Sequence, residues 1–335
     1  MKLSILDQSP ISTGKTSRNA LNASVDLARL GDELGYTRYW IAEHHDFSGL
    51  ACPNPDVMLG IIGAQTEQIR IGAGAVLLPH YKPYRVAETY NLLATLYPGR
   101  IDLGIGRAPG GSAEASMALS GNFLENVRHM PEKLDELLQF LLHDFAKNDM
   151  YAKIRPTPVP EILPQPWMLG TSEKSAIVAA ERGLPYTFGH FMTDQDGPSI
   201  ISTYTEKFAR QHPGKTPEKM AAVSVICAET TDEARDLALS GHLWSIQRDK
   251  GVGDGKVPTV SEAKNYAYTD KEKERLQKMM HKQVVGNPQE VTQQLEQLQA
   301  LYGVDEWMIV TITHSYEARK KSYELIAKAM LESGC

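Results

Sequence analysis

Two adjacent histidines flanked by carboxylates form the first group of residues able to do chemistry. Residues 42–46 read AEHHD, and the first two of them end the apolar run 38–43. Their side chains suit a metal site, a glutamate and histidine satisfied by their neighbours, or a histidine that orients a ligand or moves a proton. Adjacent strand residues point to opposite faces, and a metal needs further ligands, so we predict no metal site here. The pattern favours a histidine aimed into a pocket, where it orients a ligand or moves a proton.

An arginine and a set of hydroxyls form a candidate anion site. Residues 104–111 read GIGRAPGG, which differs from a dinucleotide fingerprint because Pro109 replaces its third glycine. Arg107 ends an apolar run, where a guanidinium can bind a phosphate through two hydrogen bonds. Residues 169–175 read LGTSEKS, so Thr171 or Ser172 caps a helix whose free N–H groups also attract anions. Ser175 lies at the same helix end, and a phosphate would fit between it and Arg107.

Small residues fill the segment 72–75, which reads GAGA. Such residues let a flat ligand approach the backbone closely, although glycine in a strand also marks an ordinary bend. The patterns GxxxxGK[ST], GxSxG, CxxC and HExxH are absent from the chain. Their absence argues against the commoner kinase, hydrolase and metalloprotease classes.

The elements that must position these residues alternate along the chain. Most of the apolar runs are nearly continuous, as in strands covered on both faces, and amphipathic stretches separate them. This alternation predicts an α/β fold, a (β/α)₈ TIM barrel in a single domain over 1–335, with the active residues at the strand ends. The stretch 249–284 breaks the rhythm and is interpreted as an insertion before the last strand, either a solvated loop and helix or a mobile lid. We expect strands at 2–7, 38–43, 69–78, 100–106, 166–170, 186–191, 221–228 and 306–313, and helices at 18–34, 84–96, 131–142, 173–182, 288–302 and 315–332.

Composition restricts the class of protein. The 335 residues carry a net charge of −6, which argues against nucleic acid or an anionic membrane as the main partner. The three cysteines lie far apart, which is typical of a reducing compartment. The N-terminus lacks a signal-peptide apolar region, and no run reaches the length of a membrane span. We therefore expect a cytoplasmic protein.

Together these motifs resemble the bacterial luciferase-like family of flavin-dependent oxidoreductases. The resemblance rests on AEHH at 42–45, GAGAVLLPH at 72–80, YPGRIDLGIGRAPGG at 97–111, LGTSEKSA at 169–176 and AERGLP at 180–185, and it extends to the terminal EWMIV. It is strongest with a subgroup of luciferase-like monooxygenases distinct from light-emitting luciferase. Luciferase has a reactive cysteine where this chain has Gly106, and its mobile loop differs from 249–284, so light emission is not implied.

The resemblance also implies roles for single residues. Arg107, Thr171, Ser172 and Ser175 match the positions that hold the flavin phosphate. Gly74 and Ala75 match a non-prolyl cis peptide beneath the flavin ring, and His44 matches a histidine beside its reacting face. Asp7, Gln8 and Ser9, at the end of the first strand, are expected to line the same cavity.

The activity that follows from the resemblance is a monooxygenase using reduced FMN and O₂ on a small organic substrate. NAD(P)H would supply the electrons, in place or through a partner flavin reductase. A homodimer is also implied, through the helices near 55–67 and 84–96. Two alternatives stay open: a deazaflavin-dependent oxidoreductase that transfers hydride, and a flavin-binding protein without turnover.

Overall fold

Parallel strands form the centre of the protein in the computed structural model, which describes residues 1–331. Eight of them pair edge to edge in the order β1 to β7 and then β9, and β9 pairs back with β1, so the sheet closes into a barrel. A short ninth strand, β8, pairs only with the end of β7. The strands are β1 (Lys2–Asp7), β2 (Arg38–Ile41), β3 (Arg70–Leu77), β4 (Ile101–Gly106), β5 (Gln165–Gly170), β6 (Tyr186–Gly189), β7 (Lys219–Cys227), β8 (Val284–Gly286) and β9 (Glu306–Val310).

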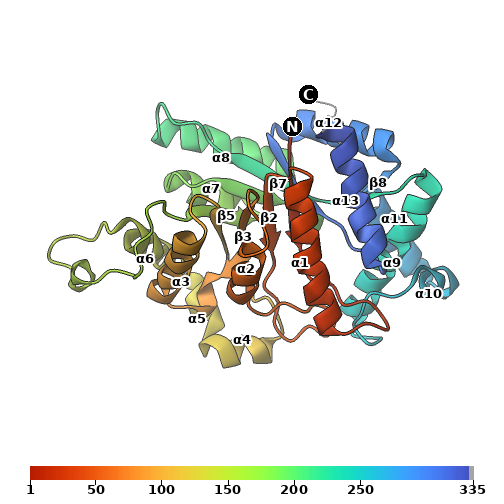
Figure 1. Ribbon diagram of the computed structural model, residues 1–335, viewed down its shortest axis with the longest axis horizontal. Helices are drawn as coiled ribbons and strands as arrows, with labels where there is room; N and C mark the ends of the chain where they lie inside the picture. The colour runs from red at the N-terminus through yellow and green to blue at the C-terminus, as the bar shows by residue number, and fades with distance from the viewer. Residues whose placement is uncertain (332–335) are drawn as a thin grey trace.

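Helices surround the barrel between successive strands (Figure 1). The short helices α4 and α5 follow the end of β4 and lie at the end of the molecule opposite the N-terminus. The helices are α1 (Ser17–Glu33), α2 (Pro55–Gly63), α3 (Pro83–Leu96), α4 (Ala113–Ser120), α5 (Phe123–Arg128), α6 (Met130–Leu142), α7 (Glu173–Glu181), α8 (Gly197–Gln211), α9 (Thr231–Lys250), α10 (Val260–Asn265), α11 (Asp270–Lys282), α12 (Pro288–Tyr302) and α13 (Tyr316–Met330), with 3₁₀ turns at Leu78–His80, Met150–Lys153 and His190–Met192.

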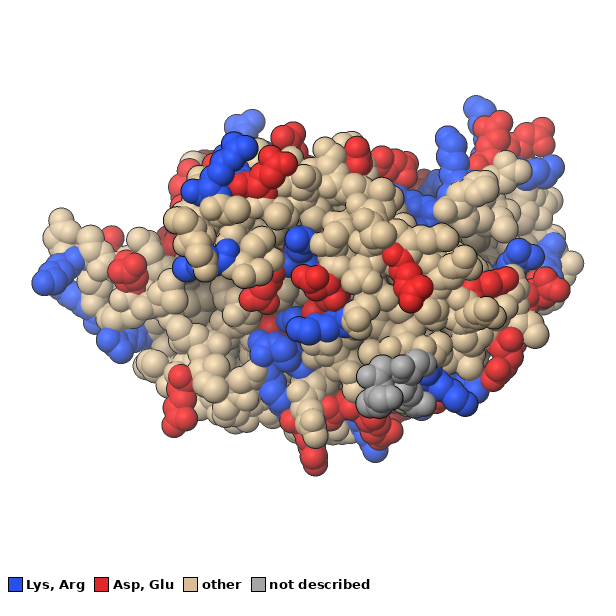
Figure 2. Space-filling model, turned by 90° about the horizontal axis from the view of Figure 1, so that it is seen from above, with Lys and Arg blue, Asp and Glu red and all other residues tan. Residues whose placement is uncertain are grey.

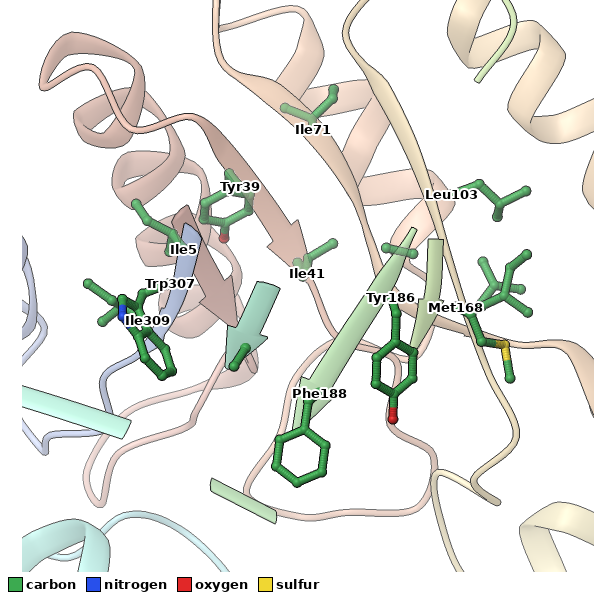
Figure 3. Packing of buried hydrophobic residues seen from close by; sticks show 14 of the residues in the cluster. Ile5, Tyr39, Ile41, Ile71, Leu103, Met168, Tyr186, Phe188, Trp307 and Ile309 are labelled. Carbon is green, nitrogen blue, oxygen red and sulfur yellow. The ribbon is translucent and has the colours of Figure 1, made fainter. Parts of the chain in front are cut away.

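The strands bury side chains on both faces, which explains their continuous apolar runs. The outward faces form the larger core against the helices, and Figure 3 shows Ile5, Ile71 and Phe188 among its members. A smaller cluster fills the barrel interior: Leu6, Trp40, Ala42, Trp167, Met220, Ala222, Met308 and Val310. The barrel is therefore a packed core, and ligands must bind at an end.

The predicted strands all occur, and the (β/α)₈ barrel is confirmed. Several strands are shorter than expected, since β2 ends at Ile41 and β9 at Val310. The stretch 249–284 contains α10, α11 and the start of β8, so it does lie as an insertion before the last barrel strand. The sequence interpretation did not identify α4, α5, α8 or the long helix α9. The last residue of the helix expected at 315–332 lies outside the described residues.

Buried charges cluster at the end of the barrel where the strands begin. Arg38 pairs with Asp102 at 2.9 Å and with Glu306 at 2.7 Å, and Arg70 pairs with Asp102 at 2.6 Å. The Arg38 guanidinium also lies 4.7 Å from the centre of the Trp167 ring. Every charge in this cluster has a partner of opposite sign, so it closes the bottom of the barrel.

The molecular surface is mixed in charge. Figure 2 shows lysine and arginine side chains interspersed with aspartate and glutamate on the face seen from above. No helix within residues 1–331 is both long enough and apolar enough to cross a membrane.

Candidate functional site

In the AEHH segment, Glu43 and His45 have hydrogen-bond partners within the protein, and His44 between them is placed differently. The Glu43 carboxylate is buried and lies 2.8 Å from Nε2 of His45, and it also accepts hydrogen bonds from the Tyr81 hydroxyl at 2.6 Å and the Leu77 N–H at 3.2 Å. Glu43 and His45 are therefore satisfied by their neighbours. His44, between them, is the member of the group left for a ligand.

His44 lies just beyond the end of β2, and its Nδ1 is buried without a hydrogen-bond partner among residues 1–331. Its ring meets that of Phe47 edge to face at 5.8 Å. Burial lowers the pKa of His44 to about 4, with smaller contributions from the positive charge of Arg248 and from His45. The imidazole is therefore neutral at pH 7, with one nitrogen that donates a hydrogen bond and one that accepts.

The loop after β4 is fixed by two histidines. The backbone N–H of His45 donates to the Gly110 carbonyl at 2.7 Å, and Nε2 of His80 lies 2.8 Å from the Pro109 carbonyl oxygen. His80 also stacks on Phe123 of α5 at 4.9 Å. These contacts hold the segment that carries Arg107 against the ends of β2 and β3.

The small residues of β3 include a cis peptide bond between Gly74 and Ala75, the geometry that the resemblance implied. The strand register shifts between Ala73 and Val76 at the same place. A Cβ on Gly74 would lie 2.8 Å from Cδ1 of Leu6, and one on Gly104 would lie 2.1 Å from the Ala73 carbonyl oxygen. Glycine is therefore required at 104, where the clash is with backbone, whereas a side chain at 74 would require the Leu6 side chain to shift.

Arg107 follows β4 directly and is exposed. Its guanidinium has no hydrogen bond or ion pair with any residue in 1–331, but its charge acts on Tyr186 of β6. Burial raises the pKa of Tyr186 to about 12, and both Ser175 and Arg107 oppose that rise. An arginine without a partner beside a hydroxyl cluster is suited to bind an anion.

The hydroxyls at the start of α7 are partly occupied by the helix itself. Ser172 is the N-cap and accepts from the Ser175 N–H at 3.4 Å, while the Ser175 hydroxyl donates to the Ser172 carbonyl at 2.6 Å. The Ser175 oxygen also lies 3.0 Å from the Tyr186 hydroxyl. Capping thus accounts for part of the serine pattern. Thr171 is half-buried, and its methyl group faces Gly189.

The expectation that Asp7 and Ser9 line the cavity is wrong. Both are fully buried on the helix side of β1, where Asp7 pairs with Arg319 of α13 and accepts from the Tyr39 hydroxyl at 2.5 Å. The Ser9 hydroxyl lies 2.8 Å from that of Ser24 in α1. Alternation along the strand explains the error, since Leu6 faces the interior and Asp7 therefore faces outward. Gln8 is half-buried.

The residues at this end of the barrel suit a flavin phosphate better than a metal ion. They provide a free guanidinium, a helix N-terminus, a neutral imidazole with an unpartnered nitrogen, and a backbone of small residues. No group of three or more histidine, cysteine or carboxylate side chains within residues 1–331 is arranged to hold a metal.

Two residues that the sequence interpretation did not single out belong to this end of the barrel. The Tyr186 hydroxyl, on β6, lies 3.0 Å from the Ser175 oxygen, and the charge of Arg107 acts on Tyr186. Figure 3 shows this hydroxyl extending away from the strand. Arg248, in the last turn of α9, acts on His44. Neither lies within ten residues of a predicted partner, so only the closed barrel shows these pairs.

Comparison with known proteins identifies relatives over the whole chain. The family model of the luciferase-like monooxygenases matches residues 1–305. Two relatives come from Bacillus subtilis (strain 168). One, named uncharacterized protein YceB, is 40% identical and covers 98% of this chain and 99% of its own. The other, named N-acetyl-S-alkylcysteine monooxygenase, is 36% identical and covers 99% and 98%.

Solved structures agree with this assignment. The crystal structure of apo-MsnO8 superposes with a TM-score of 0.88 at 34% identity and covers 98% of each chain. The oxygenating constituent of 3,6-diketocamphane monooxygenase from Pseudomonas putida, solved in complex with FMN, gives a TM-score of 0.71 at 22% identity and covers 98% of this chain and 97% of its own. This second similarity shows the fold alone.

Proposed function

Because the chain belongs to the luciferase-like monooxygenase family, we propose that it is an FMN-dependent monooxygenase acting on a small organic substrate. The proposal rests chiefly on Arg107, an exposed guanidinium without a partner in residues 1–331, whose charge acts on Tyr186 of β6. The Tyr186 hydroxyl in turn lies 3.0 Å from the Ser175 hydroxyl at the start of α7. An anionic phosphate complements both the guanidinium and the helix N-terminus.

Each part of the site has a distinct role in this proposal. Arg107, Thr171, Ser172 and Ser175 hold the phosphate, and the small residues Gly74 and Ala75 accept the flat ring system. When bound, reduced FMN supplies the electrons that activate O₂. The packed barrel interior below the site keeps water out of the reacting region, as such chemistry requires.

His44 is the catalytic residue that we propose. Because its pKa is about 4, the imidazole stays neutral at pH 7 and its buried Nδ1 needs a hydrogen-bond partner. A bound cofactor or substrate provides that partner. His44 then holds a proton at the reacting face or passes it on, while Glu43 and His45 keep its segment in place.

The electrons come from NAD(P)H in this proposal, through a separate flavin reductase or by reduction in place. The substrate panel should include N-acetyl-S-alkylcysteines, since a relative 36% identical is named for them. A second copy of the chain is the partner we propose for α2 and α3, which pack side by side. Large apolar side chains are exposed on these two helices: Val57, Ile61, Leu92 and Leu96.

The decisive experiment binds reduced FMN to the protein without oxygen and then adds ¹⁸O₂ with the substrate panel. We expect flavin binding at micromolar concentration and one labelled oxygen atom in the product. Binding of a deazaflavin with hydride transfer, and no ¹⁸O incorporation, would establish the first alternative instead. Tight binding of oxidised FMN with no turnover in the presence of a reductase would establish a flavin-binding protein.

A further inference from the structure

A second cation lies at the mouth of the barrel, outside the phosphate site. Arg248 belongs to the last turn of α9, and its guanidinium lies 5.0 Å from the centre of the Trp244 ring, one helical turn earlier. Trp244 is buried against Leu50, Val257 and Ile312. Because a buried ring holds one face of the guanidinium, Arg248 has a defined position.

The support beneath Arg248 joins α9 to the loops after β1 and β2. The Trp244 indole N–H donates to the Gly255 carbonyl at 2.6 Å. The Val257 N–H donates to the Ile11 carbonyl at 2.9 Å, in the loop that follows β1. Gly49, in the loop that follows His44, packs so tightly against Gly255 that a Cβ would lie 1.9 Å from the Gly255 carbonyl oxygen. Residues 251–258 thus fix the end of α9 beside the segment that carries His44.

The charge of Arg248 is incompletely compensated. Its Nε lies 3.6 Å from an oxygen of the adjacent Asp249, and the other oxygen of Asp249 pairs with Arg275 of α11. One carboxylate therefore serves two guanidinium groups. The Arg248 side chain is 42% exposed, so it is accessible from solvent. The packing of Gly255 against Gly49 joins the end of α9 to the loop after His44, and the positive charge of Arg248 also acts on His44.

Exposed apolar side chains lie beside His44 and just after the end of α9. Phe47, whose ring meets that of His44, is 37% exposed, and Val252, which follows the end of α9, is 46% exposed. A molecule that contacts these groups needs one anionic group and an apolar body. We propose that Arg248 binds the carboxylate of the substrate, which is a small organic acid whose apolar part extends toward His44. The inference rests on the proposed function for the identity of the reaction.

Matched pairs of acids and amides test the inference without turnover. The probes are octanoate and 4-phenylbutyrate, each beside its own primary amide, titrated into FMN-loaded protein and flavin-free protein and followed by tryptophan fluorescence. We expect each acid to bind about tenfold more tightly than its amide, because only the acid makes a charge-assisted contact with the guanidinium. A tenfold preference corresponds to about 1.4 kcal/mol. Arg248→Gln should remove this preference and leave amide binding unchanged.

Arg275→Gln is the matched control, because it removes a guanidinium that also pairs with Asp249. We expect this variant to keep the preference for the acids. Equal binding of acid and amide by the unaltered protein, no detectable binding of either acid, or equal effects of the two substitutions would overturn the inference. If the protein binds no FMN but still prefers the acids, the carboxylate site at Arg248 is supported and the proposed function is contradicted.

A second measurement checks the position of Arg248. Histidine NMR on selectively labelled protein reports the pKa of His44, which Arg248 lowers. We expect Arg248→Gln to raise this pKa, and saturating octanoate to raise it in the unaltered protein because the bound carboxylate compensates the cation. Arg275→Gln should leave it unchanged. An unchanged pKa in Arg248→Gln would contradict the proposed position.

Discussion

The two ends of the barrel treat charge in opposite ways. Where the strands begin, Arg38, Arg70, Asp102 and Glu306 pair with one another, and the Trp40 indole N–H also donates to Asp102 at 3.0 Å. Asp102 is fully buried and accepts from three side chains. Each charge of this cluster has a partner of opposite sign within residues 1–331, which suits a structural role.

Where the strands finish, polar groups lack partners within residues 1–331. The Arg107 guanidinium has none, and the buried Nδ1 of His44 has none. A buried polar atom without a hydrogen bond destabilises the fold, so a ligand that supplied the missing partner of His44 Nδ1 would stabilise it. Residues that stabilise the fold therefore lie at the end where the strands begin, and candidate functional residues lie at the end where the strands finish, as expected for this architecture. Substitutions at the two ends should therefore affect different measurements.

The largest effect is expected from Asp102→Asn. Removing this buried charge leaves Arg38 and Arg70 undercompensated, so the free energy of unfolding should fall by about 3–5 kcal/mol. Urea denaturation measures the change. Asp135→Asn is the control, because Asp135 pairs with Arg182 at the surface and should cost less than about 1 kcal/mol. Similar losses in the two variants would contradict the structural role of the buried cluster.

Arg107→Ala should show the reverse pattern. We expect FMN affinity to fall roughly 10- to 100-fold, since a charged hydrogen bond contributes about 1.5–3 kcal/mol, with the free energy of unfolding changed by less than about 0.5 kcal/mol. Flavin fluorescence titration and urea denaturation measure the two quantities. Arg210→Ala, at an exposed arginine of α8, should change neither. Unaltered FMN affinity in Arg107→Ala would show that the phosphate binds elsewhere.

His44 should make stability depend on pH. Its pKa is about 4 in the folded chain and near 6.5 in the unfolded chain, so the unfolded chain binds the extra proton between these values. The His44 contribution is complete above pH 6.5 and is lost as the pH falls toward 4. His44→Gln should reduce the loss of stability over this range by about 3 kcal/mol, measured by urea denaturation at each pH. Identical pH profiles would contradict the burial of the imidazole.

The smallest effect is expected from Ser175→Ala. This change removes a capping hydroxyl and the partner of Tyr186, so the free energy of unfolding should fall by about 1 kcal/mol. FMN affinity should fall less than in Arg107→Ala, because the guanidinium remains. A larger loss of affinity than in Arg107→Ala would make the serine the main phosphate ligand.

Elements with a local sequence signal could be predicted from the sequence. The barrel strands are continuous apolar runs, and the cap of α7 is a short hydroxyl pattern followed by a helix, so both could be predicted. The helix α9 was missed because much of its buried face consists of small or polar residues such as Ala234, Ala238 and Ser240. A three-residue strand such as β8 leaves no periodic signal.

The contacts within the site depend on closure of the barrel. The charge of Arg107, after β4, acts on Tyr186 of β6, and Arg248 acts on His44 from a helix about 200 positions later in the chain. Asp7 was placed wrongly because adjacent strand residues point to opposite faces. Its side chain therefore lies in the helix layer and not at the barrel mouth. Residue type indicated which groups can do chemistry, but only the fold shows which of them lack partners.

The most direct test of the phosphate site compares FMN with riboflavin, which lacks the phosphate. The unaltered protein should bind FMN roughly 10- to 100-fold more tightly than riboflavin, and Arg107→Ala should remove most of that preference while leaving riboflavin affinity unchanged. Equal binding of the two flavins by the unaltered protein, or a preference for FMN that survives the loss of Arg107, would contradict the assignment of this end of the barrel as the flavin phosphate site.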